Sequence, residues 1–544
     1  MLEILTTEGV RHVFGNPGTT EMPLIDALSR QTDITYVLSL QESSVIGMAD
    51  GYAQITGRPS FVNVHAAGGL GNAMGNITNA RANHTPLVIT AGQQDLRHLA
   101  SEPLLAGDLV SMPRAWVKSS QEAHSASELG TLMRRAFKDA GTTPKGPVFL
   151  SMPMNLLDEE CEVHPPARSH LSDAESTANV TELVKRLQAT AAGRLAFVMG
   201  DEALAPDCGD LVRLATALGA TVYGAPMHGR FLFPTDHALW AGALPFSGDK
   251  IRDTLARFER IVFFGDQAFM VYLYTDASPV PEGVDFIHVS ADPTQLGRAH
   301  PTSLGLAADP PAVIRQLADT IERDASLTAR ESAHKWLIDA QQGKLARDAG
   351  QERRVTERSG RAPMDPMSAV HAVMSSLPAE VLVVEEAITA SAYVRGFYRG
   401  APHAFLACRG GGLGWGMPAA IGASLGAGFT PTVCIVGDGS AMYSPQALWS
   451  AANLNVPVVF VVINNSEYRI LKQYGARTYG GSGKGGSVAM VGLDLHYPRI
   501  DFLALARSMG IQSARASTEN ETAEAVHLAV HGKTPFLLEL VVTP

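Results

Sequence analysis

The chain has 544 residues, of which 46% are apolar and 18% charged, a composition typical of folded globular proteins. Its formal net charge of −11 argues against a nucleic-acid-binding surface and against an anionic membrane as a partner. The length exceeds what a single hydrophobic core usually serves, so we expect several domains.

The cysteines and the apolar stretches predict the cellular compartment of the protein. The four cysteines lie far apart without paired spacing, which favours free thiols in a reducing environment. The first residues lack the basic region and apolar run of a signal peptide. The longest strongly apolar stretch, residues 456–463, is far short of the roughly 20 residues of a spanning helix. We therefore expect a cytoplasmic protein with no membrane partner.

Two polar segments divide the chain. Residues 159–178 contain a double proline, and residues 325–366 are charged and poor in strand-forming residues, so both are interpreted as linkers. The resulting prediction is three domains, at 1–165, 178–325 and 355–544.

Each of the three parts alternates short β-branched runs with helical periodicity. Examples are SFVNVHAAGG in the first, RIVFFGD in the second and VPVVFVVINN in the third. Continuous apolar runs that end at Gly, Asp or Asn are typical of buried parallel strands. The predicted fold class is therefore α/β, with three doubly wound parallel sheets. In such folds ligands bind beyond the carboxyl ends of the strands.

One such strand end carries a glycine-rich acidic turn. The run TVCIV is followed at once by Gly437, Asp438, Gly439 and Ser440, and a helix is expected to begin near Pro445. The two glycines would let the backbone approach an anion closely. Asp438 would repel a bare phosphate, and a metal ion between the two resolves the conflict. Oxygen ligands suit Mg²⁺ or Ca²⁺.

The following strand supplies a second candidate ligand. The run VVFVVI ends in two asparagines, and Asn465 lies 27 residues after Asp438. A helix and a strand fit between them, so both side chains return to the same edge of the sheet. We predict a metal site made of Asp438, Asn465 and the backbone carbonyl of Glu467. The alternative is a tight turn and a capped strand without a ligand.

These motifs carry a family resemblance. The spacing from GDG to NN resembles the thiamine diphosphate motif, and FGNPGTTEMP, LSLQESSVIGMADGYAQ, NVHAAGGLGNAMG and GGGLGWGMPAAIG extend the likeness along the chain. The sequence resembles the thiamine diphosphate-dependent 2-oxo acid decarboxylases and acetolactate synthases, most of all the benzoylformate decarboxylases. The resemblance implies pyrimidine-binding, middle and pyrophosphate-binding domains in that order. It also implies a homo-oligomer, a dimer of dimers, with active sites between subunits.

The resemblance assigns Glu42 to the cofactor's aminopyrimidine ring, where a carboxyl group exchanges a proton. Without a cofactor, a glutamate in the first turn of a helix is an ordinary dipole partner. In the family the residue at Leu413 wedges beneath the cofactor. Thr389 falls where the diphosphate is contacted, although a helix cap is equally plausible. The predicted cofactor-binding residues are Glu42, Thr389, Gly411, Leu413, Gly437, Asp438, Gly439, Ser440, Asn465, Tyr468, Ile470 and Leu471.

Three residues are expected on the substrate side. His65 matches a histidine that handles protons on reaction intermediates, a role that suits imidazole near neutral pH. Thr19 stands where the family has a serine that contacts the substrate carboxylate. Tyr272 stands near the place of a second family histidine, and tyrosine is a poor base at neutral pH. This last difference leaves the final protonation step open.

The leading hypothesis is the non-oxidative decarboxylation of a hydrophobic or aromatic, benzoylformate-like 2-oxo acid to an aldehyde and CO₂. The alternatives are a carboligase similar to acetolactate synthase or a carbon–carbon lyase similar to 2-hydroxyacyl-CoA lyase. A cofactor-binding protein without turnover is a third hypothesis, against which Glu42 argues. The Gly/Ser-rich run at 480–487 is interpreted as a lid or a surface loop.

Overall fold

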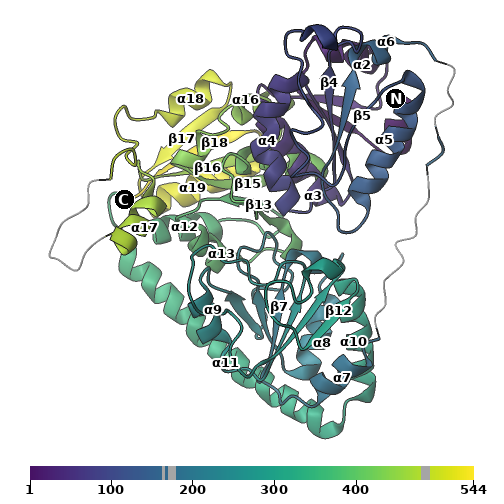
Figure 1. Ribbon diagram of the computed structural model, residues 1–544. Coiled ribbons are helices and arrows are strands. Elements are labelled where there is room, and N and C mark those ends of the chain that lie inside the picture. Colours follow the sequence, from purple (N-terminus) through teal and green to yellow (C-terminus); the bar gives the residue numbers. More distant parts are fainter. Residues whose placement is uncertain (162–165, 169–178, 480–489) are drawn as a thin grey trace. The chain divides into compact units, whose positions relative to one another are not determined.

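The computed structural model describes residues 1–161, 166–168, 179–479 and 490–544 (Figure 1). The run at 480–487 and most of the first predicted linker lie outside the described residues. The chain divides into two compact units. One comprises residues 1–170, 358–394 and 406–544, and the other comprises residues 171–357 and 395–405.

The first sheet has the strand order β2-β1-β3-β4-β6-β5, and its neighbouring strands are parallel. Its strands are β1 (His12–Gly15), β2 (Thr35–Leu38), β3 (Ser60–Val64), β4 (Leu87–Gln93), β5 (Ser120–Glu122) and β6 (Val148–Pro153). Its helices are α1 (Leu2–Thr7), α2 (Met22–Ser29), α3 (Glu42–Thr56), α4 (Ala66–Ala82), α5 (Ala126–Gly141) and α6 (Met154–Asp158).

The middle sheet has the order β12-β11-β10-β7-β8-β9. Its strands are β7 (Leu195–Met199), β8 (Thr221–Gly224), β9 (Trp240–Ala243), β10 (Arg260–Phe264), β11 (Asp285–Ser290) and β12 (Leu304–Ala307). Its helices are α7 (Thr181–Gln188), α8 (Gly209–Leu218), α9 (Gly248–Leu255) and α10 (Pro310–Asp324).

The second predicted linker is mostly one long helix. Residues Leu327–Arg358 form α11, which is 32 residues long. Only Ala333, Lys344 and Val355 are buried along it, so very few apolar residues mark its buried face. The sequence therefore lacks the periodic signal by which helices are identified.

The third sheet has the order β14-β13-β15-β16-β18-β17. Its strands are β13 (Leu382–Glu386), β14 (Phe405–Ala407), β15 (Thr432–Gly437), β16 (Val458–Asn464), β17 (Gln512–Ala516) and β18 (Phe536–Val541). Its helices are α12 (Pro366–Ser375), α13 (Ser391–Phe397), α14 (Gly416–Gly426), α15 (Asp438–Ala441), α16 (Ala447–Leu454), α17 (Arg469–Tyr479), α18 (Phe502–Ser508) and α19 (Glu519–Gly532).

The predicted fold class is confirmed, because each of the three parallel sheets is flanked by helices. The central strands β4 and β16 are buried along their whole length, which explains their continuous apolar runs. The helix expected near Pro445 is α16, which begins at Ala447, and a further short helix, α15, begins directly at Asp438.

Helices α3 and α14 join the first and third sheets within one unit. A Cβ atom on Gly51 would overlap the backbone carbonyl of Ala419, and one on Gly422 would overlap that of Met48. The two helix backbones therefore touch directly at glycines. Within the described part of the chain, no helix combines the length and the hydropathy that crossing a lipid bilayer requires.

Candidate active site

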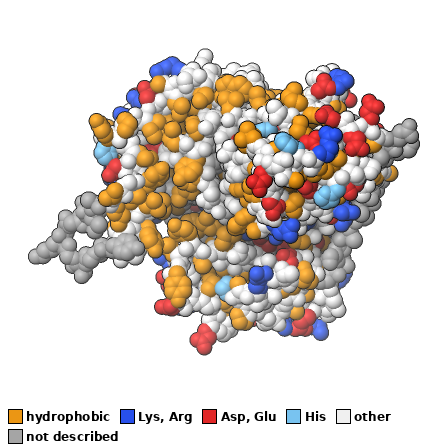
Figure 2. Space-filling model, turned by 45° about the horizontal axis from the view of Figure 1, so that its top comes forward, with side chains coloured by type: hydrophobic (Ala, Val, Ile, Leu, Met, Phe, Trp, Pro, Cys, Tyr) orange, Lys and Arg blue, Asp and Glu red, His pale blue; other side chains and the backbone are white. Residues whose placement is uncertain are grey.

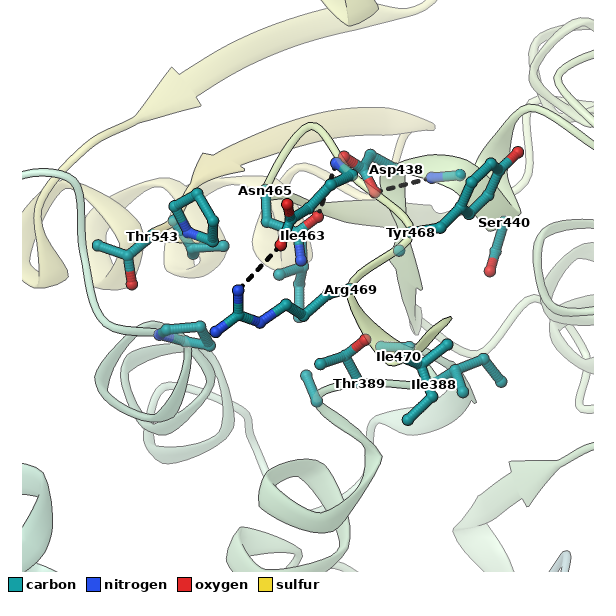
Figure 3. Close-up of a pocket in the computed structure, with 18 of the residues that line it drawn as sticks. Ile388, Thr389, Asp438, Ser440, Ile463, Asn465, Tyr468, Arg469, Ile470 and Thr543 are labelled. Atoms are coloured by element: carbon teal, nitrogen blue, oxygen red, sulfur yellow. Dashed lines mark hydrogen bonds and ion pairs between the residues drawn. The ribbon is translucent and has the colours of Figure 1, made fainter. Parts of the chain in front are cut away.

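A cavity of about 240 Å³ opens at the carboxyl ends of β13, β15 and β16. Figure 3 shows Asp438, Asn465 and Tyr468 on one side of it, facing Thr389, Ile388 and Ile470. The predicted site residues that line the cavity are Thr389, Leu413, Gly437, Asp438, Gly439, Ser440, Asn465, Glu467, Tyr468 and Ile470. The structure thus brings ten of the predicted residues to one place.

Asp438 joins the ends of two neighbouring strands. It follows β15 and is buried, with 5% of its surface exposed. One carboxylate oxygen accepts a hydrogen bond from the N–H of Gly439 (2.8 Å), and the other accepts one from the N–H of Ser466 after β16 (2.6 Å). Burial raises the pKa of Asp438 to about 6. A cation beside this carboxylate would favour its ionised form.

The two asparagines after β16 have different functions. Asn464 points back into the sheet, where its amide donates to the buried carboxylate of Glu539 (2.7 Å). Asn465 lines the cavity, and its side-chain oxygen accepts from the N–H of Glu467 (3.1 Å). Ser466 between them has a positive φ of 56°, which turns the chain sharply. This turn places Asn465 on the side of Asp438.

The side chain of Glu467 is held by cations. Its buried carboxylate is paired with Arg469 (3.1 Å) and with Lys472. These ion pairs leave its backbone carbonyl as the group that Glu467 can offer to a metal. Among the described residues, no cluster of three or more His, Cys, Asp or Glu side chains could hold a metal by itself. A carboxylate, an amide oxygen and a carbonyl, completed by phosphate oxygens, fit a hard cation such as Mg²⁺.

The GDG turn is shaped for close approach. A Cβ atom at position 439 would lie 2.5 Å from the Tyr468 ring, so only glycine fits there. The cavity is smaller than the roughly 300–1,000 Å³ that encloses a typical small-molecule ligand. Its size and its oxygen donors fit the diphosphate end of thiamine diphosphate, with the remainder of the cofactor outside this cavity.

Leu413 enters the cavity from a glycine-rich loop between β14 and α14. Gly411 and Gly414 have φ values of +71° and +91°, a region that favours glycine. Gly411 itself does not line the cavity. The loop is held by Glu386, whose carboxylate accepts from the N–H groups of Gly414 (2.6 Å), Trp415 (3.2 Å) and Gly416 (2.9 Å). Burial raises the pKa of Glu386 to about 7.

Glu42 belongs to a second site at the first sheet. It opens α3 and is 8% exposed. Its two carboxylate oxygens accept from the side-chain amides of Asn16 and Asn72, each at 3.0 Å. Glu42 is not among the residues that line the cavity beside Asp438. Within one chain the two predicted ends of the cofactor site are therefore separate.

His65 lies close to this second site, at the N-cap of α4. Its Nδ1 is 2.8 Å from a carboxylate oxygen of Glu21 and 3.1 Å from the hydroxyl of Thr20. The Glu21 carboxylate is fully buried and accepts from the N–H groups of Gly18 and Gly92, each at 2.9 Å. Because Nδ1 is committed, Nε2 is the nitrogen that can exchange a proton with a substrate.

The other predicted residues are not brought to the cavity. Thr19 is exposed beside the buried Thr20. Leu471 follows Ile470 on α17 but is 44% exposed and does not line the cavity. Tyr272 lies in the second compact unit, with 68% of its surface exposed. Its predicted role stays a prediction.

Several residues escaped the sequence analysis. Glu21 and Glu386 are buried carboxylates with hydrogen-bond partners far along the chain, Gly92 and Gly416 respectively. The cavity is also lined by residues that were not predicted: Ile388, Tyr393, Arg469 and Gln473 lie close in sequence to predicted ones, and Arg358 and Thr543 come from distant segments. Asn72 could have been found, because it is one of four asparagines at helical spacing in α4 and at its C-cap.

Comparison with known proteins shows the family of the chain. Family models of thiamine pyrophosphate enzymes match residues 1–114 (N-terminal TPP binding domain), 180–317 (central domain) and 388–540 (C-terminal TPP binding domain). The benzoylformate decarboxylase of Pseudomonas aeruginosa is 32% identical, over 99% of this chain and 97% of that protein. The chain belongs to the thiamine pyrophosphate enzyme family.

Two further relatives extend the likeness over the whole chain. The solved 4-hydroxybenzoylformate decarboxylase of Rhodococcus jostii superposes with a TM-score of 0.85 at 28% identity, covering 99% of this chain and 98% of that one. An acetolactate synthase large subunit of Haemophilus influenzae is 25% identical, over 96% of this chain and 90% of that protein. The protein is therefore a thiamine diphosphate-dependent enzyme related to both groups, which confirms the predicted family and enzyme class.

Proposed function

We propose that this enzyme decarboxylates a hydrophobic or aromatic 2-oxo acid, resembling benzoylformate, to an aldehyde and CO₂. The observation that carries the proposal is His65, held through Nδ1 by the buried Glu21 with its other nitrogen available, in a chain similar over its full length to two decarboxylases of aryl 2-oxo acids. We further propose Mg²⁺, bound by Asp438, Asn465 and the backbone carbonyl of Glu467.

The separation of Glu42 from the cavity supports a shared active site. We propose that Glu42 of one subunit meets the cavity of a second copy of the chain. Large apolar side chains are exposed near both sites: Leu40, Leu104 and Leu105 on the first sheet's side, and Ile388, Met442, Tyr443 and Tyr474 on the cavity's side. Figure 2 shows hydrophobic side chains gathered over a broad part of one face. Burying such surface favours association, and a dimer of dimers is the assembly that we propose.

When bound, thiamine diphosphate supplies a nucleophilic carbon that adds to the keto carbon and accepts the electrons released as CO₂ leaves. The protein's residues hold the reactants and move protons. Glu42, fixed by Asn16 and Asn72, exchanges a proton with the pyrimidine ring nitrogen. His65 exchanges protons with the substrate-derived oxygen or carbon through Nε2. Thr19 offers a hydroxyl group to the substrate carboxylate.

Apolar side chains at the cavity favour loss of the carboxylate. Leu413, Ile388 and Ile470 line the space beside the diphosphate end. An environment that excludes water destabilises a charged carboxylate relative to neutral CO₂. The same side chains suit an aromatic or aliphatic substituent, because a small polar acid would leave this surface uncovered.

The proposal is tested by CO₂ release from benzoylformate, phenylpyruvate and pyruvate, with thiamine diphosphate and Mg²⁺ added. We expect benzoylformate or phenylpyruvate to be turned over with a kcat/KM well above that of pyruvate. Isothermal titration gives the cofactor affinity independently. Tight cofactor binding without CO₂ release from any of the three acids would contradict the proposed decarboxylation.

The same assay distinguishes the carboligase alternative, which the full-length acetolactate synthase relative favours. A carboligase would consume pyruvate and form acetolactate in amounts that match the CO₂ released. A preference for pyruvate with acetolactate as the main product would replace the decarboxylase proposal with this alternative.

A further inference from the structure

Helix α4 carries four asparagines along one face. Asn72, Asn76, Asn79 and the C-cap residue Asn83 are spaced by four, three and four residues, which places them on the same side of a helix. Asn76 and Asn79 are buried, and burying an amide is costly unless it is hydrogen-bonded. We call these four residues the asparagine stripe.

The first two residues of the asparagine stripe, Asn72 and Asn76, contact the first turn of α3, which begins at Glu42. Asn72 donates to the Glu42 carboxylate at 3.0 Å. Asn76, one turn further along, donates to the backbone carbonyl of Ser43 at 2.7 Å. Both asparagines therefore fix the first turn of α3, one through the side chain of Glu42 and one through its neighbour's backbone.

The last two residues of the asparagine stripe, Asn79 and Asn83, contact the loop that carries Leu413. Asn79 forms a reciprocal pair with Gly412, donating to its carbonyl (2.9 Å) and accepting from its N–H (3.0 Å). Asn83 accepts from the N–H of Arg409 at 2.9 Å. A Cβ atom at Gly410 would overlap the side chain of Asn79, so the loop lies directly against the stripe.

Asn76 contacts both the first turn of α3 and the loop that carries Leu413. Besides Ser43, its amide donates to the carbonyl of Gly414 at 3.4 Å, and its oxygen accepts from the amide of Asn79 at 2.7 Å. Both N–H bonds of Asn76 and both of Asn79 are thus used. Rotating either amide by 180° would set donor against donor, so the network has one orientation.

We propose that the asparagine stripe is a positioning device that ties the Glu42 carboxyl to the Leu413 loop. This inference rests on the proposed function, in which Glu42 and Leu413 serve the cofactor. In the proposed shared site, Glu42 reaches the partner's cofactor while Leu413 contacts the cofactor of its own chain. The stripe then joins parts of two different active sites, and Asn76 is the residue that acts on both.

The first test measures the loop in the full-length protein without cofactor. Hydrogen–deuterium exchange of residues 409–416 is compared between the wild type, Asn79→Ala and Asn76→Ala. Losing the reciprocal pair should speed exchange at Gly412 by about tenfold or more in Asn79→Ala. The matched control is Asn63→Ala, because Asn63 is equally buried but its amide donates to Thr90 in the neighbouring strand (3.1 Å). This control should leave the exchange of residues 409–416 unchanged.

The second test compares the variants by their affinity for the cofactor and by their kcat. Asn79→Ala should weaken thiamine diphosphate binding at saturating Mg²⁺ by about tenfold, whereas Asn72→Ala should leave binding within about twofold and lower kcat instead. Asn76→Ala should change both. If an alanine variant does not fold, the serine variant keeps a short polar side chain and replaces it.

The outcomes separate the two proposals. Unchanged exchange at residues 409–416 in both Asn76→Ala and Asn79→Ala would overturn the role of the stripe, whatever the enzyme's activity. An Asn76→Ala variant that changes only the affinity or only kcat would overturn its dual action. Faster exchange in a protein whose wild type binds no thiamine diphosphate would instead count against the proposed function.

Discussion

The first and third sheets have the same topology, yet their strand ends are built for different tasks. In both sheets the second strand lies at one edge beside the first, followed by the third, fourth, sixth and fifth. In the third sheet backbone N–H groups hold Asp438, and the cavity opens beside it. In the first sheet side-chain amides hold Glu42. The shared topology therefore places both carboxylates at strand ends, and the local hydrogen-bond donors determine what each carboxylate can do.

The choice of donor has a physical consequence. Two backbone N–H groups fix Asp438 without using all of its lone pairs, which suits a carboxylate that must also bind a cation. Glu42 also accepts two hydrogen bonds from uncharged donors, but these are the side-chain amides of Asn16 and Asn72. A carboxyl group held by neutral donors keeps its position whether or not it is protonated, as proton exchange requires.

The strongest test of this comparison is Glu42→Gln. Glutamine keeps the shape and loses the exchangeable acid, so kcat should fall by about 10³-fold while cofactor binding remains. Steady-state kinetics and calorimetric titration with thiamine diphosphate measure the two quantities. Full activity in this variant would show that Glu42 does not have the assigned role.

Asp438→Asn should produce the opposite pattern, with the main loss in binding. Removing a charged oxygen ligand should weaken Mg²⁺-dependent binding of thiamine diphosphate by roughly a hundredfold. Titration of the cofactor at several Mg²⁺ concentrations measures this loss. Saturating cofactor and metal should restore much of the activity, and the absence of any change in affinity would place the metal elsewhere.

His65→Ala should lower kcat by about 10²-fold, because a positioned proton donor is lost. Cofactor affinity should stay within about twofold of the wild type, since His65 does not line the diphosphate cavity. Glu21→Gln should lower kcat as well, because one end of its amide would face the N–H of Gly18 or Gly92 and the support of Nδ1 would be disturbed. Equal kcat values for His65→Ala and the wild type would exclude His65 from proton transfer.

Glu386→Gln should change the dependence of stability on pH. Burial raises the pKa of Glu386 from 4.5 to about 7, so the folded state binds this proton more tightly than the unfolded chain does. Its contribution to stability is complete below pH 4.5 and is lost as the pH rises to about 7. That loss amounts to roughly 3 kcal/mol at most.

Urea unfolding at several pH values measures this effect. The free energy of unfolding of the wild type should fall more steeply between these two pH values than that of Glu386→Gln. Parallel pH profiles for the two proteins would show that Glu386 does not titrate there.

Tyr272→Phe is expected to have the smallest effect. It removes one hydroxyl group, which corresponds to a loss of about fivefold in kcat/KM if the hydroxyl bonds the substrate. Tyr274→Phe is a natural control, because Tyr274 is 87% exposed and its hydroxyl donates to Asp276. Indistinguishable kinetics for the two variants would remove Tyr272 from the site.

Residues at strand ends were the most predictable part of the molecule. Asp438 and Asn465 could be brought together from the sequence because parallel strands end at one edge of a sheet. Ile470 and Leu471 were harder, since neighbouring helix residues point in different directions and only Ile470 faces the cavity. Arg358 and Thr543 reach the cavity from distant segments, and no local pattern encodes such an approach.

Helices without a conventional apolar face were also difficult to predict. Helix α11 is polar on most sides, so residues 325–366 were interpreted as a linker. Helix α4 has a hydrogen-bonding face in place of part of its apolar one, and the spacing of its asparagines was visible in the sequence. Searching for polar residues with helical periodicity would have identified that face.

The glycine contact between α3 and α14 sets a rule for building chimeric enzymes from members of this family. Gly51 and Gly422 allow the two helices to meet without intervening side chains, and a larger residue at either position would push the backbones apart. A chimera that takes the first sheet from one parent and the third from another must therefore take matching partners for this contact. Crossovers on either side of the middle sheet keep both helices from the same parent and leave the contact intact.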